Sequence, residues 1–299
     1  MSDKPHLLHL FTAQSWASPF DVNMAYDAGF TAVTPYTGID TAQIRALTQD
    51  AIFSRGPKGV RNTGIMIGGR DIEVALASFA ASREAMVPPF AASVLVDPSG
   101  AFTTAAAMVA CVEQVLRDHA STSLNGLRVV VVGGTGPVGQ TAGIIAAMQQ
   151  ARVTLLSSSS SAKAEQAAAF CREQFGVTIE GALAREPADL ARQLADADVV
   201  LACAAAGIEV VSEAALRAAR QLKVAADVNA VPPAGIHGLD AMTNGDTIAG
   251  TSVRGIGALA IGNIKYQVES GLLKQMLASQ EALYLSFPEA FELARQRVA

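Results

Sequence analysis

Residues 128–139 read RVVVVGGTGPVG, a run of four valines that ends in a glycine-rich turn. A short β-branched run predicts a buried strand, and the Ala- and Ile-rich residues 138–149 predict a helix after it. Gly134, Gly136 and Gly139 match the dinucleotide fingerprint GxGxxG. We expect Gly134 to permit the tight turn, Gly136 to let the main chain approach a pyrophosphate, and Gly139 to let the helix pack on the strand. This stretch predicts a Rossmann-like domain.

The start of the predicted helix adds a reason to expect phosphate here. The first amide groups of a helix have no partner within it, and its dipole places partial positive charge at the same end. We therefore expect a nicotinamide dinucleotide on the whole loop; its residues are Gly134, Thr135, Gly136, Pro137, Val138 and Gly139. The alternative is a glycine-rich turn that binds no ligand.

The next strand bears on the choice between NAD and NADP. NAD-binding domains carry an acid ~20 residues after the glycines, but here residues 157–161 read SSSSS. The hydroxyls of Ser157, Ser158 and Ser159 can donate to a 2′-phosphate, and Lys163 adds positive charge. These features favour NADP. The alternative is that the serines only form a turn and both nucleotides bind, because no arginine is evident beside them to clamp a phosphate.

Later strand ends of the same domain add further cofactor candidates. Ala204, Asp227 and Asn229 follow predicted strands, where the nicotinamide of such a domain lies. Asn229 can satisfy the carboxamide; the alternative is an Asx turn before the two prolines at 232–233.

The whole chain alternates between strand and helix patterns, which predicts an α/β fold with parallel sheets. The polar residues 119–126 separate two such series, so we expect a substrate domain at 1–122, a nucleotide domain at 123–265 and a C-terminal helical segment at 266–299. Strands are expected at 7–11, 30–34, 64–67, 92–96, 128–132, 153–156, 198–203, 224–227 and near 253. Helices are expected from 18, at 41–53, at 71–86, from 103, and at 138–149, 163–175 and 213–220.

Composition narrows the class of protein. The 299 residues are 51% hydrophobic and 16% charged, with a net charge of −5, which argues against a nucleic-acid partner. Cys111, Cys171 and Cys203 lie far apart and predict neither a disulfide framework nor a zinc site, as in a reducing cytoplasm. We expect no metal site, since the four histidines lack metal-ligand spacing. No apolar run of the ~18 residues that a membrane span needs is evident.

Several longer stretches resemble one family. Over essentially the whole chain, the sequence is similar to the methylene-tetrahydromethanopterin dehydrogenases of methylotrophic bacteria, especially the branch that accepts NAD and NADP. The loop at 157–161 departs from that pattern, because it carries neither the basic pair of the NADP-only relatives nor an acid. The matching stretches are 18–24 (SPFDVNM), 35–38 (PYTG), 49–55 (QDAIFSR), 87–90 (VPPF), 97–100 (DPSG), 102–104 (FTT), 227–235 (DVNAVPPAG) and 255–265 (GIGALAIGNIK).

This resemblance implies a reaction and an architecture. The reaction would be reversible hydride transfer from methylene-tetrahydromethanopterin to NAD(P)+, leaving the methenyl form, on the route from formaldehyde to carbon dioxide. The architecture would be an N-terminal pterin domain, a nucleotide domain and a C-terminal helix that returns to the first domain. The family further implies a homo-oligomer, expected to be a trimer. The cysteines and the lack of a long apolar run lead us to expect a cytoplasmic protein with no membrane partner.

The resemblance also points to residues for the pterin. It places a functional lysine at Lys265, which we expect to orient the pterin ring; the alternative is a solvated helix lysine. Phe20 is expected to stack on the pterin and Asp21 to bind its amino-pyrimidine edge; the alternative is helix capping. A further group is expected to bond pterin or nicotinamide amides, the alternative being turn and N-cap chemistry: Asp97, Ser99, Gly100, Thr103 and Thr104.

Three other functions stay open on the sequence. A methylene-tetrahydrofolate dehydrogenase would perform the same chemistry on a different carrier. A shikimate- or quinate-type dehydrogenase shares the domain order but needs a Lys/Asp pair for proton transfer, and Lys265 comes late in the chain for that role. A non-catalytic NADP-sensing module would bind the nucleotide without turnover.

Overall fold

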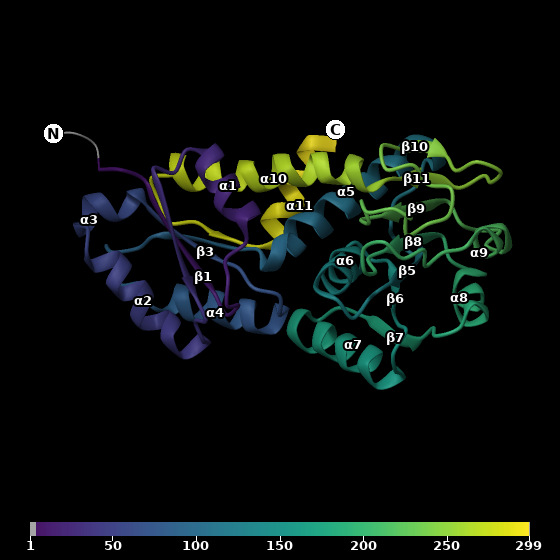
Figure 1. Cartoon of the computed structure of the whole chain (residues 1–299), viewed down its shortest axis with the longest axis horizontal. Helices are drawn as coiled ribbons and strands as arrows, with labels where there is room; N and C mark the ends of the chain where they lie inside the picture. Colours follow the sequence, from purple (N-terminus) through teal and green to yellow (C-terminus); the bar gives the residue numbers. More distant parts are fainter. Residues whose placement is uncertain (1–3, 299) are drawn as a thin grey trace. The chain divides into compact units, whose positions relative to one another are not determined.

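The computed structural model describes residues 4–298, which form two compact α/β units (Figure 1). The first unit comprises the described residues up to Thr103 together with Tyr266–Leu293. The second unit comprises Thr104–Lys265 and the described residues from Ala294 onward. The α/β class and the return of the C-terminal segment to the first unit are as predicted.

The first unit contains a five-stranded parallel sheet in the order β12-β4-β3-β1-β2. Its last member, β12, comes from the C-terminal segment and pairs with β4. The strands are β1 (Leu7–Thr12), β2 (Ala32–Thr37), β3 (Thr63–Ile67), β4 (Ser93–Val96) and β12 (Tyr284–Leu285), and the helices are α1 (Pro19–Ala28), α2 (Thr41–Phe53), α3 (Gly56–Gly59) and α4 (Ile72–Glu84), with 3-10 turns at Val60–Asn62 and Pro98–Gly100.

Side-chain caps begin the main helices of this unit. Ser18 accepts a hydrogen bond from the Asp21 amide and so caps the start of α1, the helix expected from residue 18. Asp40 caps α2 and Asp71 caps α4 in the same way. Each cap satisfies amide groups that the helix itself leaves without a partner, so the strand-to-helix connections are fixed locally.

The second unit contains a seven-stranded sheet in the order β10-β11-β9-β8-β5-β6-β7. Without β10, which pairs antiparallel, the strands read 3-2-1-4-5-6 from the β7 side, the order of a two-halved dinucleotide-binding sheet. The predicted Rossmann-like domain is therefore confirmed. The strands are β5 (Arg128–Val132), β6 (Arg152–Ser157), β7 (Ile179–Leu183), β8 (Val199–Ala202), β9 (Val224–Asp227), β10 (Asn244–Thr247) and β11 (Arg254–Ile256).

The second unit also contains the helices α5 (Ala101–Ala120), α6 (Pro137–Met148), α7 (Ser161–Phe175), α8 (Pro187–Leu194) and α9 (Glu213–Ala218) (Figure 1). Two later helices are divided between the units: α10 (Ala258–Ala278) continues into the first unit after Lys265, and α11 (Phe287–Val298) continues into the second after Leu293. Five helices and strands were absent from the sequence prediction: α3, β7, α8, β10 and β12. Only Ile179 of β7 is buried, so this strand shows no clear alternation, and α8 buries Leu190 and Leu194 at helical spacing but has only eight residues.

The division between the units differs from the boundary expected at residue 122. It falls between Thr103 and Thr104, inside the first turn of α5. Most of α5 packs with the second unit: Met108 contacts the Cys203 thiol, and Glu113 forms an ion pair with Arg295. The polar residues 119–126 therefore include the end of α5 and the loop after it, and they lie within the second unit.

The expectation that no segment has the length and hydropathy of a membrane span was wrong. Pro98–Ala120 meets that criterion, but 78% of its most apolar window is buried inside the protein. Ala and Val side chains of α5 make up much of that buried surface, so its hydropathy is that of a core helix.

Candidate nucleotide and substrate sites

The glycine-rich loop lies where the strand order of the second sheet reverses, between β5 and β8. A Cβ added to Gly133 would lie 2.7 Å from the backbone N of Ala204, so the loops after these two strands pass very close together. Gly133 also has a left-handed φ of 75°. The tight turn therefore depends on Gly133, which corrects the role expected for Gly134.

The fingerprint glycines do different work. A Cβ on Gly139 would lie 2.5 Å from the Gly133 carbonyl oxygen, so this residue lets α6 approach the loop, as expected. A Cβ on Gly134 would lie 2.8 Å from the Leu155 Cα, so Gly134 permits packing against β6. Gly136 has φ −84° and ψ 165°, which other residues also adopt. A Cβ added to it would have the Gly133 carbonyl oxygen as its nearest neighbour, at 3.5 Å. The fold alone does not require glycine at 136.

The N-terminus of α6 is built from main chain. Gly136 is the N-cap and makes no side-chain cap bond, and Pro137 occupies the first turn. Gln140 Nε2 donates to the Thr135 carbonyl oxygen at 3.0 Å, a bond that fixes the loop to the first turns of α6. The first amides of this twelve-residue helix, including that of Val138, have the arrangement that binds phosphate in dinucleotide folds.

The serine loop after β6 divides into buried and exposed hydroxyls. Ser157 is buried, and its Oγ accepts from the amides of Ser159 at 3.2 Å and Ser160 at 3.4 Å. Ser160 caps α7 by accepting from the Lys163 amide. Ser157 thus serves the turn, whereas Ser158, Ser159 and the Lys163 side chain are exposed.

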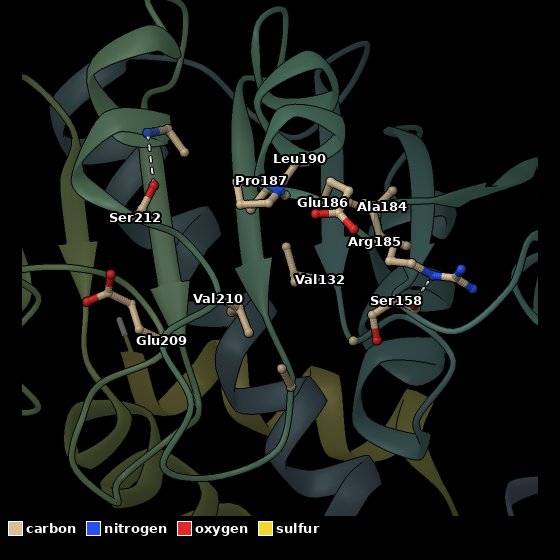
Figure 2. Close-up of a pocket in the computed structure, with 14 residues that line it drawn as sticks. Val132, Ser158, Ala184, Arg185, Glu186, Pro187, Leu190, Glu209, Val210 and Ser212 are labelled. Carbon is tan, nitrogen blue, oxygen red and sulfur yellow. Dashed lines mark hydrogen bonds between the residues drawn. The ribbon is translucent and has the colours of Figure 1, made fainter.

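A cavity of about 310 Å³ opens beside these two loops (Figure 2). Its apolar wall includes Val132, Leu156, Ala184 and Leu190, from β5, β6, the β7–α8 connection and α8. Such a slot between the ends of β5, β6 and β7 has the size and polarity to take a planar ring.

Charged side chains also line this cavity: Arg185, Glu186 and Glu209. Arg185 reaches the serine loop, where its Nε donates to the Ser158 carbonyl oxygen at 3.5 Å and its Nη2 to that of Ser159. The statement that no arginine stands beside the serines is therefore wrong. Arg185 is distant in sequence and follows β7, a strand that was not predicted.

The loop after β9 uses its polar groups internally. Asp227 is buried and accepts from the amides of Asn229 at 2.9 Å and Gly235 at 2.7 Å. Burial raises the pKa of the Asp227 carboxyl, although these amide bonds oppose the shift. Asn229 accepts from the amides of Gly207 and Val231 and donates to the Pro233 carbonyl. Both residues shape the loop as an Asx-type turn does.

In the first unit, side-chain bonds hold the loop after β4, and one of them reaches the loop after β3. Asp97 is fully buried: its Oδ1 accepts from the Phe102 amide at 2.8 Å, and its Oδ2 from Thr103 Oγ1 at 2.6 Å. Ser99 has a left-handed φ of 54° and donates to the Gly69 carbonyl at 2.6 Å. Gly100 also has positive φ. The turn and N-cap chemistry that the sequence left as an alternative is present here.

The start of α1 lies at the same strand ends. Asp21 is 3% exposed, and a Cβ added to Gly68 would lie 3.6 Å from its Oδ2. Phe20 is 46% exposed. An acid and a partly exposed aromatic ring thus stand next to each other beside the end of β3.

Lys265 and Thr104 lie on long helices. Lys265 is 9% exposed in α10, so it is not the solvated lysine that the sequence left open. The helix begins at Ala258, which places Lys265 within it and not after an irregular glycine-rich segment. Thr104 is half-buried in α5, next to the buried Thr103. Among residues 4–298, no three His, Cys, Asp or Glu side chains are grouped to hold a metal ion.

The strand order and the glycine loop at its reversal point define a dinucleotide-binding α/β protein. Residues 121–236 match a family model described as putative NAD(P)-binding, and residues 19–99 match one described as methylene-tetrahydromethanopterin dehydrogenase, N-terminal. The chain is 42% identical to the NAD(P)-dependent methylenetetrahydromethanopterin dehydrogenase of Methylorubrum extorquens, over 96% of this chain and 97% of that protein. It belongs to the methylene-tetrahydromethanopterin dehydrogenase family.

Two further comparisons concern the family and the fold. The chain is 32% identical to the bifunctional protein MdtA of the same organism, over 97% of this chain and 98% of that protein. Its fold is similar to that of shikimate 5-dehydrogenase from Listeria monocytogenes, with a TM-score of 0.53 and 10% identity over 99% of this chain and 96% of the other. The second likeness concerns the fold alone.

Proposed function

We propose that this protein transfers a hydride between the one-carbon bridge of methylene-tetrahydromethanopterin and a nicotinamide dinucleotide. The observation that carries the proposal is the family match along the whole chain, including the pterin-type N-terminal model at residues 19–99. The main-chain loop after β5 supplies the second requirement, a place for a diphosphate.

The dinucleotide would lie along the carboxyl ends of β5, β6, β8 and β9. The loop of residues 134–139 would bind the pyrophosphate, the cavity beside Leu156 and Leu190 would take the adenine, and the loops at Ala204 and Asn229 would border the nicotinamide. When bound, the nicotinamide accepts or gives back the hydride. The protein then has to align two rings and exclude water, so its contribution is mainly positioning.

The substrate groups are proposed from the first unit and from α10. Phe20 would stack on the pterin, and the buried carboxylate of Asp21 would accept from its amino-pyrimidine edge. Ser99, Gly100, Thr103 and Thr104 would lie near the bound rings, with Asp97 holding the turn. Lys265 would hold the polar edge of the pterin, offset from the carbon that becomes cationic.

NADP is the cofactor we favour, because no carboxylate follows β6 and the exposed hydroxyls of Ser158 and Ser159 can donate to a 2′-phosphate. We also propose a cytoplasmic homo-oligomer, expected to be a trimer, that needs neither nucleic acid nor a membrane.

The proposal is tested by mixing the purified protein with NAD(P)+ and methylene-tetrahydromethanopterin and following the absorbance of the reduced nicotinamide. We expect turnover with this carrier and a much lower rate with methylene-tetrahydrofolate. A clear preference for the folate would show that the proposed carrier is wrong and that the protein is a methylene-tetrahydrofolate dehydrogenase. Binding of NADP+ without any absorbance change with either carrier would instead identify a nucleotide sensor.

Lys265 provides the residue-level test. Because its side chain is buried, Lys265→Met keeps most of the aliphatic volume and removes only the ammonium group. We expect the variant to fold and its turnover to fall at least about tenfold, while the dissociation constant of NADP+ stays close to wild type. Wild-type kinetics would remove Lys265 from the site.

A further inference from the structure

We infer that Arg185, together with the exposed hydroxyls of Ser158 and Ser159, forms a subsite for the adenosine 2′-phosphate and sets the preference for NADP over NAD. This inference rests on the proposed binding of a dinucleotide at the loop after β5. It adds a residue that sequence spacing does not reveal.

The position of the adenosine follows from the topology. In a sheet of this order, the ribose of the adenosine lies at the end of the strand next to the one with the glycine loop, which is β6. The serine loop begins at that end, and the cavity beside it is lined by Gly133, Leu156 and Ser158. A 2′-phosphate on that ribose would project toward the serine loop.

Arg185 presents its guanidinium at the same place (Figure 2). Its Nε and Nη2 donate to the carbonyl oxygens of Ser158 and Ser159, which holds the planar group against the loop. Nη1 has no partner among residues 4–298, and no carboxylate of that part of the chain forms an ion pair with Arg185. A guanidinium fixed along one edge keeps N–H donors for a phosphate on another.

The backbone at Arg185 is also fixed. Asp189 Oδ2 accepts from the amides of Arg185 at 3.2 Å and Glu186 at 3.0 Å, at the start of α8. This carboxylate therefore stabilises the turn from which the arginine extends. The side chain is exposed, so its removal leaves the core intact.

Glu186 lines the same cavity and opposes the effect of Arg185. In Figure 2 its carboxylate turns toward Val132, whereas Arg185 extends toward Ser158. A carboxylate near a 2′-phosphate costs binding energy through like-charge repulsion, and it can accept a hydrogen bond from a free ribose hydroxyl. The neighbouring pair thus balances the two nucleotides, with Arg185 favouring NADP and Glu186 favouring NAD.

The test measures binding of two fragments by calorimetry, with no carrier present: adenosine 2′,5′-bisphosphate, which has the 2′-phosphate, and 5′-AMP, which lacks it. We expect Arg185→Gln to weaken binding of the bisphosphate about 10- to 100-fold, as for loss of a charge-assisted hydrogen bond. The dissociation constant of 5′-AMP should change less than about twofold. Arg185→Lys should recover part of the loss, and Glu186→Gln should strengthen the bisphosphate.

Arg152→Gln is the matched control, because Arg152 is also exposed and donates to a carbonyl, that of Gly126, at the opposite end of β6. Arg152→Gln should leave the affinity for both fragments unchanged. Equal weakening of both fragments by Arg185→Gln, or no change in either, would overturn the inference while leaving the dinucleotide site in place. If the wild-type protein binds neither fragment, both the inference and the proposed nucleotide site are wrong.

Discussion

The carboxyl edges of the two sheets are built from different groups. In the second unit, the edge after β5 is made of main chain, with glycines at 133, 134, 136 and 139 and no side-chain cap on α6. In the first unit, the edge after β3 and β4 is made of side-chain bonds, centred on the buried Asp97. A main-chain edge recognises a diphosphate of any dinucleotide, whereas a side-chain edge can recognise one pattern of donors and acceptors.

The largest expected effect is a loss of stability when a side chain is added within the main-chain edge of the second unit. Gly139→Val places a Cβ against the Gly133 oxygen and Gly134 Cα, which are backbone atoms that cannot move aside. We expect the free energy of unfolding to fall by more than about 3 kcal/mol, or folding to fail, in a denaturant titration.

Gly136→Val is the comparison variant for that experiment. The fold leaves room at Gly136, so stability should change by less than about 0.5 kcal/mol, while NADP+ binding should weaken at least about 100-fold because the loop can no longer approach the pyrophosphate. Wild-type affinity in this folded variant would refute the assignment of the loop.

The second prediction breaks the side-chain edge by removing a group. Asp97→Ala removes the acceptor of the buried Phe102 amide, and it leaves the Thr103 hydroxyl only its longer bond, to the Gly100 carbonyl at 3.3 Å. We expect a loss of about 2 to 3 kcal/mol in unfolding free energy, since each buried donor left without an acceptor costs about 1 to 3 kcal/mol. Asp71→Ala is the control: it removes an exposed cap and should cost about 1 kcal/mol. Equal losses would mean that burial adds nothing at Asp97.

The sequence predicted the main-chain edge well and the side-chain environment poorly. A βα turn is a local feature, so RVVVVGGTGPVG was sufficient to locate β5, the loop and α6, and residues 224–227 likewise gave β9. The individual glycine roles depend on which strand lies opposite. Gly134 packs on β6, a contact made across the sheet, and the fingerprint alone does not specify it.

Arg185 shows why the rest could not be predicted. It lies between β7, a strand with one buried residue, and a helix of only eight residues, and elements so little buried or so short are hard to recognise in a single sequence. Its closeness to Ser158 and Ser159 comes from the pairing of β6 with β7, which is a long-range contact. Ser157 was expected to face the ligand, but its burial follows from the same register and commits its hydroxyl to the turn.

The third prediction concerns how the stability of the first unit depends on pH through His9 in β1. Burial, with a contribution from the charge of Arg55, lowers the pKa of His9 below its usual 6.5. The unfolded chain therefore binds the proton more tightly, so the contribution of neutral His9 is complete above about pH 6.5 and is lost as pH falls toward the folded pKa. His9→Gln should flatten the decline in stability between about pH 7 and pH 5. An unchanged slope would assign the decline to other groups.

The smallest expected effect distinguishes two contributions to stability at Ser99: its hydrogen bond and its left-handed backbone. This residue donates to the Gly69 carbonyl and has a left-handed φ of 54°, which glycine adopts without steric cost. Ser99→Ala removes the bond and keeps the strain, so we expect a loss of about 1 kcal/mol. Ser99→Gly removes both, so it should be more stable than Ser99→Ala by about 0.5 to 1 kcal/mol in paired denaturant titrations, despite the greater backbone freedom of glycine in the unfolded chain. If Ser99→Gly is instead the less stable variant, the left-handed backbone at residue 99 costs less than the extra freedom that glycine gives the unfolded chain.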